Sequence, residues 1–330
     1  MQLFVFDGYK QVGAVVSFST LEWVRRYNAY GEFTLKVPFT AENYELLAPW
    51  RMLYHRDTKE AGVILGRNVV RSGDGTEEIT VTGPFLSEIL RVRTYRYTGV
   101  GRVDTIVNGL VSQALITAAN ANRVLPGLRI GAYDIPAITV DLAQSDKDYI
   151  LYELVNQLAL QYDIGFAVDF LPSEAACAFR MYKGRDTNVV FAEDLGNVLD
   201  QDYFESRDGY RNTCVIGNVV VGDANAGLRR REATTTSNAA GGTVAEQGAL
   251  YLQQFPAVET FDAVINDASA QFVYMRDWDL GDAVTFRNRR YGLELYRRIV
   301  EVKESYDLDA RHISVLVGDP IPTARQIIRR

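Results

Sequence analysis

The alternation of apolar and polar side chains between residues 20 and 38 predicts a β-hairpin. Residues 28–31, with the sequence Asn-Ala-Tyr-Gly, provide the turn between its two arms. The side chains that share one face are Leu21, Trp23, Arg25 and Tyr27 in the first arm and Phe33, Leu35 and Val37 in the second. Arg25 is unusual because it lies in line with aromatic residues, where a half-buried strand would carry an apolar side chain.

This arginine has two interpretations. A cation stacked on the rings of Trp23 and Tyr27 is typical of a packed junction or a subunit interface. Alternatively, the hairpin is exposed and Arg25 extends over Trp23 toward water. The pattern alone leaves both open. Under the first interpretation the candidate interface or structural residues are Trp23, Arg25, Tyr27, Phe33, Trp278 and Arg298.

Short strands separated by turn residues are predicted for most of residues 1–97. Besides the hairpin, the predicted strands cover residues 2–6, 12–18, 51–56, 62–71 and 77–82. Such a series favours a small barrel or sandwich as the first domain.

Residues 98–199 are predicted to form an α+β insertion. The composition changes at residues 99–101, and apolar residues then recur at helical spacing from Asp104, the expected helix cap, to about residue 120. A second helix is predicted between residue 146 and Tyr162. The strands predicted after it cover residues 166–170 and 177–181.

Strands return in residues 200–330, beginning with one strand predicted at 212–221. A polar, mobile loop at 233–242 and a short helix at 244–254 are expected within an insertion around 230–268. Residues 278–318 repeat the layout of residues 50–83: a tryptophan, strands alternating with polar turns, an arginine and a closing glycine. The strands predicted in the second copy include 293–296 and 299–303. The similarity is loose, and the pattern does not decide whether it reflects a duplication. A duplication would give two barrels in one chain. The predicted fold class is therefore mainly β, with an α+β domain between two β-barrels.

Composition excludes several classes of protein. The chain has 330 residues, 47% apolar and 23% charged, which is typical of a folded protein with two or three domains. Its formal charge of -7 argues against nucleic-acid binding driven by net charge. Cys177 and Cys214 show neither zinc-site nor disulfide-framework spacing, so synthesis in a reducing cytoplasm is expected. We find no signal peptide or membrane-spanning segment and expect no membrane insertion.

No catalytic site can be assembled from sequence motifs, so we predict that the chain is not an enzyme and has no catalytic residue, metal ligand or cofactor. His55 and His312 are the only histidines, and neither has a ligand at metal-site spacing. Residues 99–104 begin like a dinucleotide fingerprint, but Asp104 would repel a pyrophosphate. An EF-hand starting at Asp277 would need a glutamate at position 288, which is asparagine.

Three stretches along nearly the whole chain carry a resemblance to a known family. They are Trp23-Val24-Arg25-Arg26-Tyr27 through Phe33, Leu35 and Pro38; Glu153-Leu154-Val155-Asn156-Gln157-Leu158-Ala159 through Gly165-Phe166; and Trp278-Asp279-Leu280-Gly281-Asp282-Ala283-Val284 through Arg298 to Gly318. In this order they resemble the tail-hub proteins of siphophages and prophages, the tail-associated or baseplate hub family.

The resemblance implies a structural role in the virion, at the tail tip or baseplate, after synthesis in the cytoplasm of a bacterial host. Family members form a homotrimeric ring in which each chain contributes two tube-protein-like β-barrels. The ring joins the six-fold tail tube to the three-fold tip, and genomic DNA passes through it. The implied partners are tail-tube proteins, distal tail or baseplate proteins, and a central fibre or tip protein.

Two other functions are considered. The first is a tail-associated cell-wall hydrolase, because longer family members carry such enzymes in a C-terminal extension. This chain continues for only about a dozen residues after Gly318, so such a module is expected in another polypeptide. The second is a host carbohydrate-binding protein, although the predicted loop at 233–242 offers no aromatic residue for it.

Overall fold

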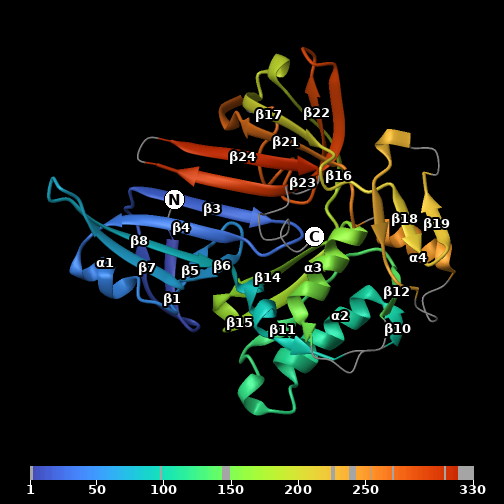
Figure 1. The fold of residues 1–330 in the computed structure, drawn as a ribbon. Coiled ribbons are helices and arrows are strands. Elements are labelled where there is room, and N and C mark those ends of the chain that lie inside the picture. Colours follow the sequence, from blue (N-terminus) through green and yellow to red (C-terminus); the bar gives the residue numbers. More distant parts are fainter. Residues whose placement is uncertain are drawn as a thin grey trace.

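The largest sheet joins the two ends of the chain, with the N-terminal strands in blue beside the C-terminal strands in red (Figure 1). Eight of its ten strands follow one another in the order β17-β21-β24-β23-β3-β4-β8-β7, and each neighbouring pair is antiparallel. The bounds of these strands are β3 (Thr20–Arg26), β4 (Glu32–Pro38), β7 (Gly66–Arg71), β8 (Glu77–Pro84), β17 (Val198–Ser206), β21 (Val258–Ile265), β23 (Leu293–Tyr306) and β24 (Arg311–Gly318). The hairpin predicted for residues 20–38 is confirmed as β3 and β4.

This computed structural model describes residues 3–96, 99–142, 149–223, 227–237, 243–252, 254–269, 271–307 and 310–318. Strands predominate in these ranges, so the prediction of a mainly β protein is confirmed. The same ranges contain several sheets, none of which closes into a barrel. The two closed barrels that we expected within one chain are therefore not confirmed.

The eight-stranded path consists of two blocks with the same internal order. We call β3-β4-β8-β7 the N-terminal block and β17-β21-β24-β23 the C-terminal block. In both blocks, the first and second strands in the sheet are also first and second along the chain. The fourth strand in the sheet comes before the third along the chain. The blocks meet where β3 pairs with β23, with Arg25 opposite Val302. One sheet thus contains the same arrangement twice, head to tail.

A second sheet covers the N-terminal block. Its order is β2-β1-β5-β6, with bounds β1 (Leu3–Asp7), β2 (Lys10–Val15), β5 (Met52–His55) and β6 (Glu60–Val63). Apolar side chains from both sheets form one core, in which Leu3, Val5 and Leu53 join residues of β3, β4 and β8. The two sheets therefore form a sandwich, which short alternating strands favour as an alternative to a barrel.

The C-terminal block is extended by β22 (Ala283–Asn288), which pairs with the first half of β23, and by β16 (Asp186–Ala192), which pairs with β22. We predicted two strands at 293–296 and 299–303, but β23 is one strand of 14 residues. In contrast, the strand predicted at 62–71 divides into β6 and β7. The tryptophans of the apparent repeat also differ, because Trp50 is 77% exposed and Trp278 is fully buried.

The middle of the chain contains two main helices against a small sheet. Their bounds are α2 (Val103–Val111), continued by a π-helical turn at Ser112–Ile116, and α3 (Leu151–Tyr162). The sheet β11-β15-β14 comprises β11 (Leu128–Ile130), β14 (Gly165–Leu171) and β15 (Ala176–Tyr182), and the short paired strands are β9 (Thr94–Tyr95) with β13 (Tyr149–Ile150) and β10 (Gly99–Arg102) with β12 (Thr139–Leu142). The apolar core of this region continues into Phe6 and Tyr54 of the covering sheet. Asp104, the expected cap, lies instead in the first turn of α2.

After β17, the chain forms a three-stranded sheet with one helix. Its elements are β18 (Thr213–Ile216), β19 (Val219–Gly222), β20 (Glu232–Thr234) and α4 (Val244–Leu252). The single strand predicted from residue 212 to 221 is a hairpin, because Gly217 adopts a left-handed conformation with φ of 58°. Of the mobile loop predicted at 233–242, residues 238–242 lie outside the described residues.

One helix near the N-terminus was not predicted. This helix is α1 (Ala41–Leu46), which Thr40 caps by accepting a hydrogen bond from the Asn43 N–H. Among the described residues, none of the helices is long and apolar enough to cross a bilayer.

Candidate functional site

Strand β3 and Tyr27, the residue that follows it, direct three inward side chains into three different surroundings. Trp23 enters the core of the N-terminal sandwich, Tyr27 enters the core of the C-terminal block, and Arg25 lies between them. This arrangement follows from the two-residue period of a strand that pairs with both β4 and β23. The face that looked inconsistent in the sequence therefore crosses a boundary between two cores.

Trp23 and Phe33 form the apolar side of this boundary. Both are buried, and their rings stack with centroids 5.9 Å apart. The indole Nε1 of Trp23 donates a hydrogen bond of 3.3 Å to an oxygen of Glu60, which is itself buried. The aromatic core thus ends at a charged group.

Arg25 is only 4% exposed, and its guanidinium contacts both halves of the chain. Its Nε lies 2.9 Å from Oε2 of Glu60 on β6. Its Nη1 lies 2.6 Å from Oδ1 of Asp279 and 2.8 Å from the hydroxyl of Tyr274, both in the segment that precedes β22. Burial alone would lower the pKa of Arg25, but Glu60, Tyr274 and Asp279 raise it well above its usual value, so the group stays charged.

A second carboxylate, Glu304 of β23, is 1% exposed beside this group. It accepts hydrogen bonds from the hydroxyls of Tyr274, at 3.2 Å, and Tyr306, at 2.6 Å, and it pairs with Arg311 at 3.1 Å. Burial, followed by the charge of Glu304, raises the pKa of Tyr306, so its hydroxyl remains a donor. Together Arg25, Glu60, Tyr274, Asp279 and Glu304 form what we call the ionic junction.

The ring of Tyr27 occupies a space that two glycines leave open. A Cβ atom on Gly165 or on Gly281 would overlap its Cε2 and Cδ2 atoms. The Tyr27 hydroxyl contacts the carbonyl of Asp163 at 3.1 Å and accepts a hydrogen bond from the Gly184 N–H at 3.2 Å. Burial raises the pKa of Tyr27 to about 12. The tyrosine is therefore a neutral anchor between the C-terminal block and the middle of the chain.

Arg298 extends this anchor. Its Nε lies 2.7 Å from both carboxylate oxygens of Asp163, the residue that ends α3 in a left-handed conformation. Its Nη1 donates a hydrogen bond of 2.6 Å to the carbonyl of Gly281, and its Cζ lies 5.8 Å from the ring centre of Tyr27. The guanidinium therefore connects β23, α3 and the turn before β22.

The turn of the hairpin is fixed to the same helix. The side-chain amide of Asn28 donates hydrogen bonds to the carbonyls of Ala159, at 3.1 Å, and Ile164, at 2.9 Å. Asn156 of α3 donates one of 2.8 Å to the carbonyl of Asn28. These bonds attach the turn to the end of α3, where the Ala159 carbonyl also accepts hydrogen bonds from the N–H groups of Asp163 and Ile164.

Trp278 is fully buried against Phe191 and Tyr274, with ring centroids at 5.3 and 4.8 Å. In the part of the chain that the structure describes, its indole N–H has no hydrogen-bond partner. Trp278 therefore supports the wall of the ionic junction through Tyr274 rather than by a polar contact.

The three stretches that resemble tail-hub proteins converge on this place in the fold. The first supplies Arg25 and Tyr27, the second supplies Gly165, and the third supplies Asp279 and Arg298. Every one of these groups is paired with a neighbour or packed against one, and the arrangement holds three parts of the chain together.

Sequence reasoning missed several members of the site. Glu60 was assigned to a polar turn, and nothing along the sequence links it to a residue 35 positions away. Glu304 could have been found, because it lies in line with Val302 on β23 as Arg25 lies in line with Trp23. In the described ranges, no three His, Cys, Asp or Glu side chains are grouped so as to hold a metal ion.

Comparison with solved structures shows the same fold in phage tail proteins. The chain is similar to the 43 kDa tail protein of prophage MuSo2 from Shewanella oneidensis, with a TM-score of 0.61 and 14% identity over 96% of this chain and 97% of that one. It is similar to prophage tail protein gp18 from Listeria monocytogenes, with a TM-score of 0.61 and 11% identity over 100% of this chain and 98% of that one.

A third similar structure is the E. coli c3393 protein, with a TM-score of 0.50 and 10% identity over 93% of this chain and 74% of that one. That protein is described as a component of the type VI secretion system with structural similarity to the T4 bacteriophage tail proteins gp27 and gp5. No curated protein matches the sequence.

Sequence comparison gives the family. The resemblance to phage tail proteins, first noted in three stretches, is confirmed by a family profile that matches residues 2–319. Since this match spans almost all of its 330 residues, the chain belongs to the family of Siphovirus ReqiPepy6 Gp37-like proteins.

Proposed function

We propose that this protein is a structural component of a phage tail, and that it forms the hub at the tail tip or baseplate. Three copies would form a ring that joins the six-fold tail tube to the three-fold tip and lets genomic DNA pass. The observation that carries this proposal is the occurrence of the same four-stranded block twice in one sheet. Three copies of the chain would thus present six equivalent blocks.

The two ends of the sheet support head-to-tail assembly. Strands β7 and β17 end the eight-stranded path, and neither pairs with a further strand in the described part of the chain. Strand directions alternate along the whole path, so β7 of one copy would be antiparallel to β17 of the next, as β23 is to β3. Such a contact joins two different surfaces and can close into a ring.

Each of the three parts of the chain has a proposed place in the ring. Residues 1–97 and 200–330 would each take the place of one tube-protein-like barrel, and residues 98–199 would pack outside the ring. Strand β16 falls in the middle part but pairs with β22 of the last part. We further propose that Trp23, Arg25, Tyr27, Phe33, Trp278 and Arg298 have a structural role, holding the two barrel-like parts in register.

The proposed partners are tail-tube proteins, distal tail or baseplate proteins, and a central fibre or tip protein. The similar prophage tail proteins support a place in the tail, and the c3393 protein, with its described similarity to gp27 and gp5, supports a place in the hub. The formal charge of -7 also suits a channel, because weak phosphate binding would let DNA slide.

Measuring the mass of the protein in solution tests whether three copies form a ring. Native mass spectrometry and negative-stain images should show a trimeric ring for the wild type or for its complex with tail-tube protein. Val70→Asp on β7 and Leu199→Asp on β17 place charges at side chains that are 47% and 63% exposed, and both should abolish the ring. Val220→Asp on β19, at 50% exposure, is the matched control and should leave it intact.

The hub proposal would be overturned if the chain remained a monomer in the presence of tail-tube protein. It would also be overturned if the Val70→Asp and Leu199→Asp variants still formed rings. The alternative of a cell-wall hydrolase has a separate test. Incubating the purified chain with host peptidoglycan should release no soluble fragments, and release that scales with the chain's concentration would show an enzyme.

A further inference from the structure

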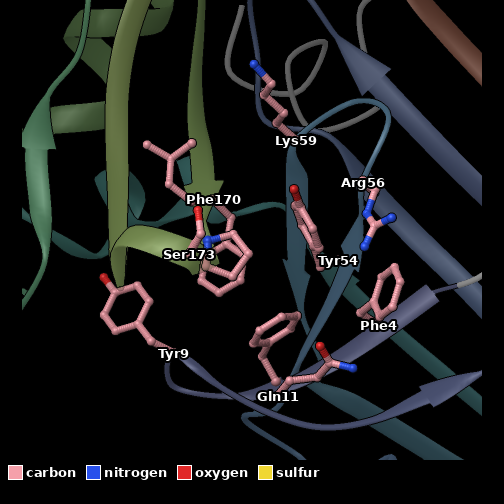
Figure 2. Close-up of a pocket in the computed structure, with 11 residues that line it drawn as sticks. Phe4, Tyr9, Gln11, Tyr54, Arg56, Lys59, Phe170 and Ser173 are labelled. Atoms are coloured by element: carbon pink, nitrogen blue, oxygen red, sulfur yellow. The ribbon is translucent and has the colours of Figure 1, made fainter.

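An open hollow of about 610 Å³ lies where the N-terminal sandwich meets the middle of the chain. Its walls come from β1, β2, β5, β14 and the turns beside them, so they belong to elements outside the ionic junction. Figure 2 shows Tyr9 and Phe170 on one side and Tyr54 and Phe4 on the other, with Gln11 at one end. The volume falls within the range of about 300–1,000 Å³ that is usual for small-molecule sites.

The aromatic walls are held in place before any ligand arrives. The ring of Tyr9 stacks on Phe170 with an angle of 8° between the planes, and its hydroxyl donates a hydrogen bond of 2.8 Å to the carbonyl of Pro126. Tyr54 and Phe170 meet edge to face at 5.5 Å. A ligand would therefore meet fixed ring surfaces and would order few side chains on binding.

Two cations lie at the rim. Arg56 and Lys59 are exposed, and neither forms an ion pair within the described ranges. The Cζ of Arg56 lies 5.0 Å from the ring centre of Phe4. Lys59 adopts a left-handed backbone conformation, with φ of 58°, that side chains other than glycine, asparagine and aspartate rarely take. Asp57, between the two cations in sequence, does not line the hollow.

We infer that this hollow is a binding site for a sugar unit that carries a carboxylate or a phosphate. The C–H faces of a sugar ring pack on aromatic faces, whose π-electrons carry partial negative charge. Its hydroxyls match the amide of Gln11 and the hydroxyl of Ser173, which both line the hollow. The anionic group matches Arg56 and Lys59, since guanidinium groups bind carboxylates and phosphates through paired hydrogen bonds.

The mixture of groups favours a sugar over a side chain of a protein partner. An apolar side chain would fill the aromatic part and leave two cations and an amide without partners. A sugar acid or sugar phosphate carries apolar faces, hydroxyls and a negative charge on one ring-sized unit. This site lies apart from the sheet edges β7 and β17, so its test is independent of the hub proposal.

Saturation-transfer NMR on the full chain provides the test, with glucuronic acid and glucose 6-phosphate as anionic probes and glucose as the neutral probe. Both anions should receive saturation, and their affinities should exceed that of glucose by at least tenfold at low salt. The double variant Arg56→Gln, Lys59→Gln should remove that preference. The matched control Lys36→Gln, on β4 and away from the hollow, should keep it.

Blocking the hollow gives a second readout. Gln11 is exposed on β2, so Gln11→Trp can fill the space without entering a core, and it should abolish binding of all three sugars. Equal saturation of glucose and glucuronic acid, or an anion preference that survives the loss of both cations, would overturn the assignment. If none of the three sugars received saturation and Gln11→Trp blocked incorporation of the chain into tails, the hollow would be a contact site for a protein instead.

Discussion

Arg25 and Glu60 form a buried ion pair that joins β3 to the sheet covering it, with 2.9 Å between Nε and Oε2. The same guanidinium reaches Asp279, so a single side chain connects the N-terminal sandwich to the segment before β22. These contacts explain why an arginine lies in line with aromatic residues on β3. The line of side chains passes from one core to another, and the charge lies between them.

Removing Arg25 should be costly, because it would leave Glu60 buried without its cation. We expect Arg25→Met to lower the free energy of unfolding by about 3–5 kcal/mol, measured by urea denaturation. Arg26 on the same strand pairs with Glu32 and Glu301 but is 28% exposed, so Arg26→Met should cost only about 0–1 kcal/mol. Equal losses in the two variants would contradict a special role for the buried pair.

The two tryptophans of the apparent repeat should respond very differently to truncation. Trp23 is fully buried against Phe33 and Phe85, so Trp23→Ala should lower the unfolding free energy by about 3–5 kcal/mol. Trp50 is 77% exposed, and Trp50→Ala should change it by no more than about 0.5 kcal/mol. Thermal unfolding monitored by circular dichroism would show the difference, and a stable Trp23→Ala variant would refute it.

The close approach of Tyr27 to Gly165 leaves no room for a methyl group. Gly165→Ala should therefore destabilise the fold by about 1–3 kcal/mol through overpacking. Gly109 in α2 is the matched control, since a Cβ there meets open space and alanine favours helices by about 0.5–1 kcal/mol. The two substitutions should thus shift the urea midpoint in opposite directions.

His55 should make the stability depend on pH. Its imidazole is 4% exposed, and burial lowers its pKa below the usual value of 6.5. The unfolded chain therefore binds a proton near pH 6.5 that the folded chain does not, so stability is retained above pH 6.5 and falls as the pH decreases below it. The slope from this group is at most about 1.4 kcal/mol per pH unit.

Urea unfolding at pH 7.5 and pH 5.5 would measure this effect. His55→Phe should reduce the loss between the two pH values, because no proton can bind at that position. His312→Gln changes a side chain that is 51% exposed and should leave the loss in place. An unchanged loss in the His55 variant would assign it to other groups.

Local pattern was enough to predict the hairpin at 20–38, the two helices of the middle region and the strands around Gly165. It failed where a strand could continue or break, as at Gly217 and at the long strand β23. Periodicity shows which face of a strand is buried, but it does not show which distant residue lies against that face. For this reason Arg25 was identified as a candidate while its partner Glu60 was missed.

The seam between β3 and β23 has a consequence for folding. Lys303 and Glu22, which pair across it at 2.7 Å, are 281 residues apart in sequence, whereas each block also contains hairpins with short connections. Contacts between distant residues form late, because closing a long loop costs more entropy. Newly made chains would therefore expose the edge of β3, with Arg25 lacking its partners Tyr274 and Asp279, until the last strands are made. A charged edge is a poor template for pairing with another copy, so the arginine also protects the chain from premature association.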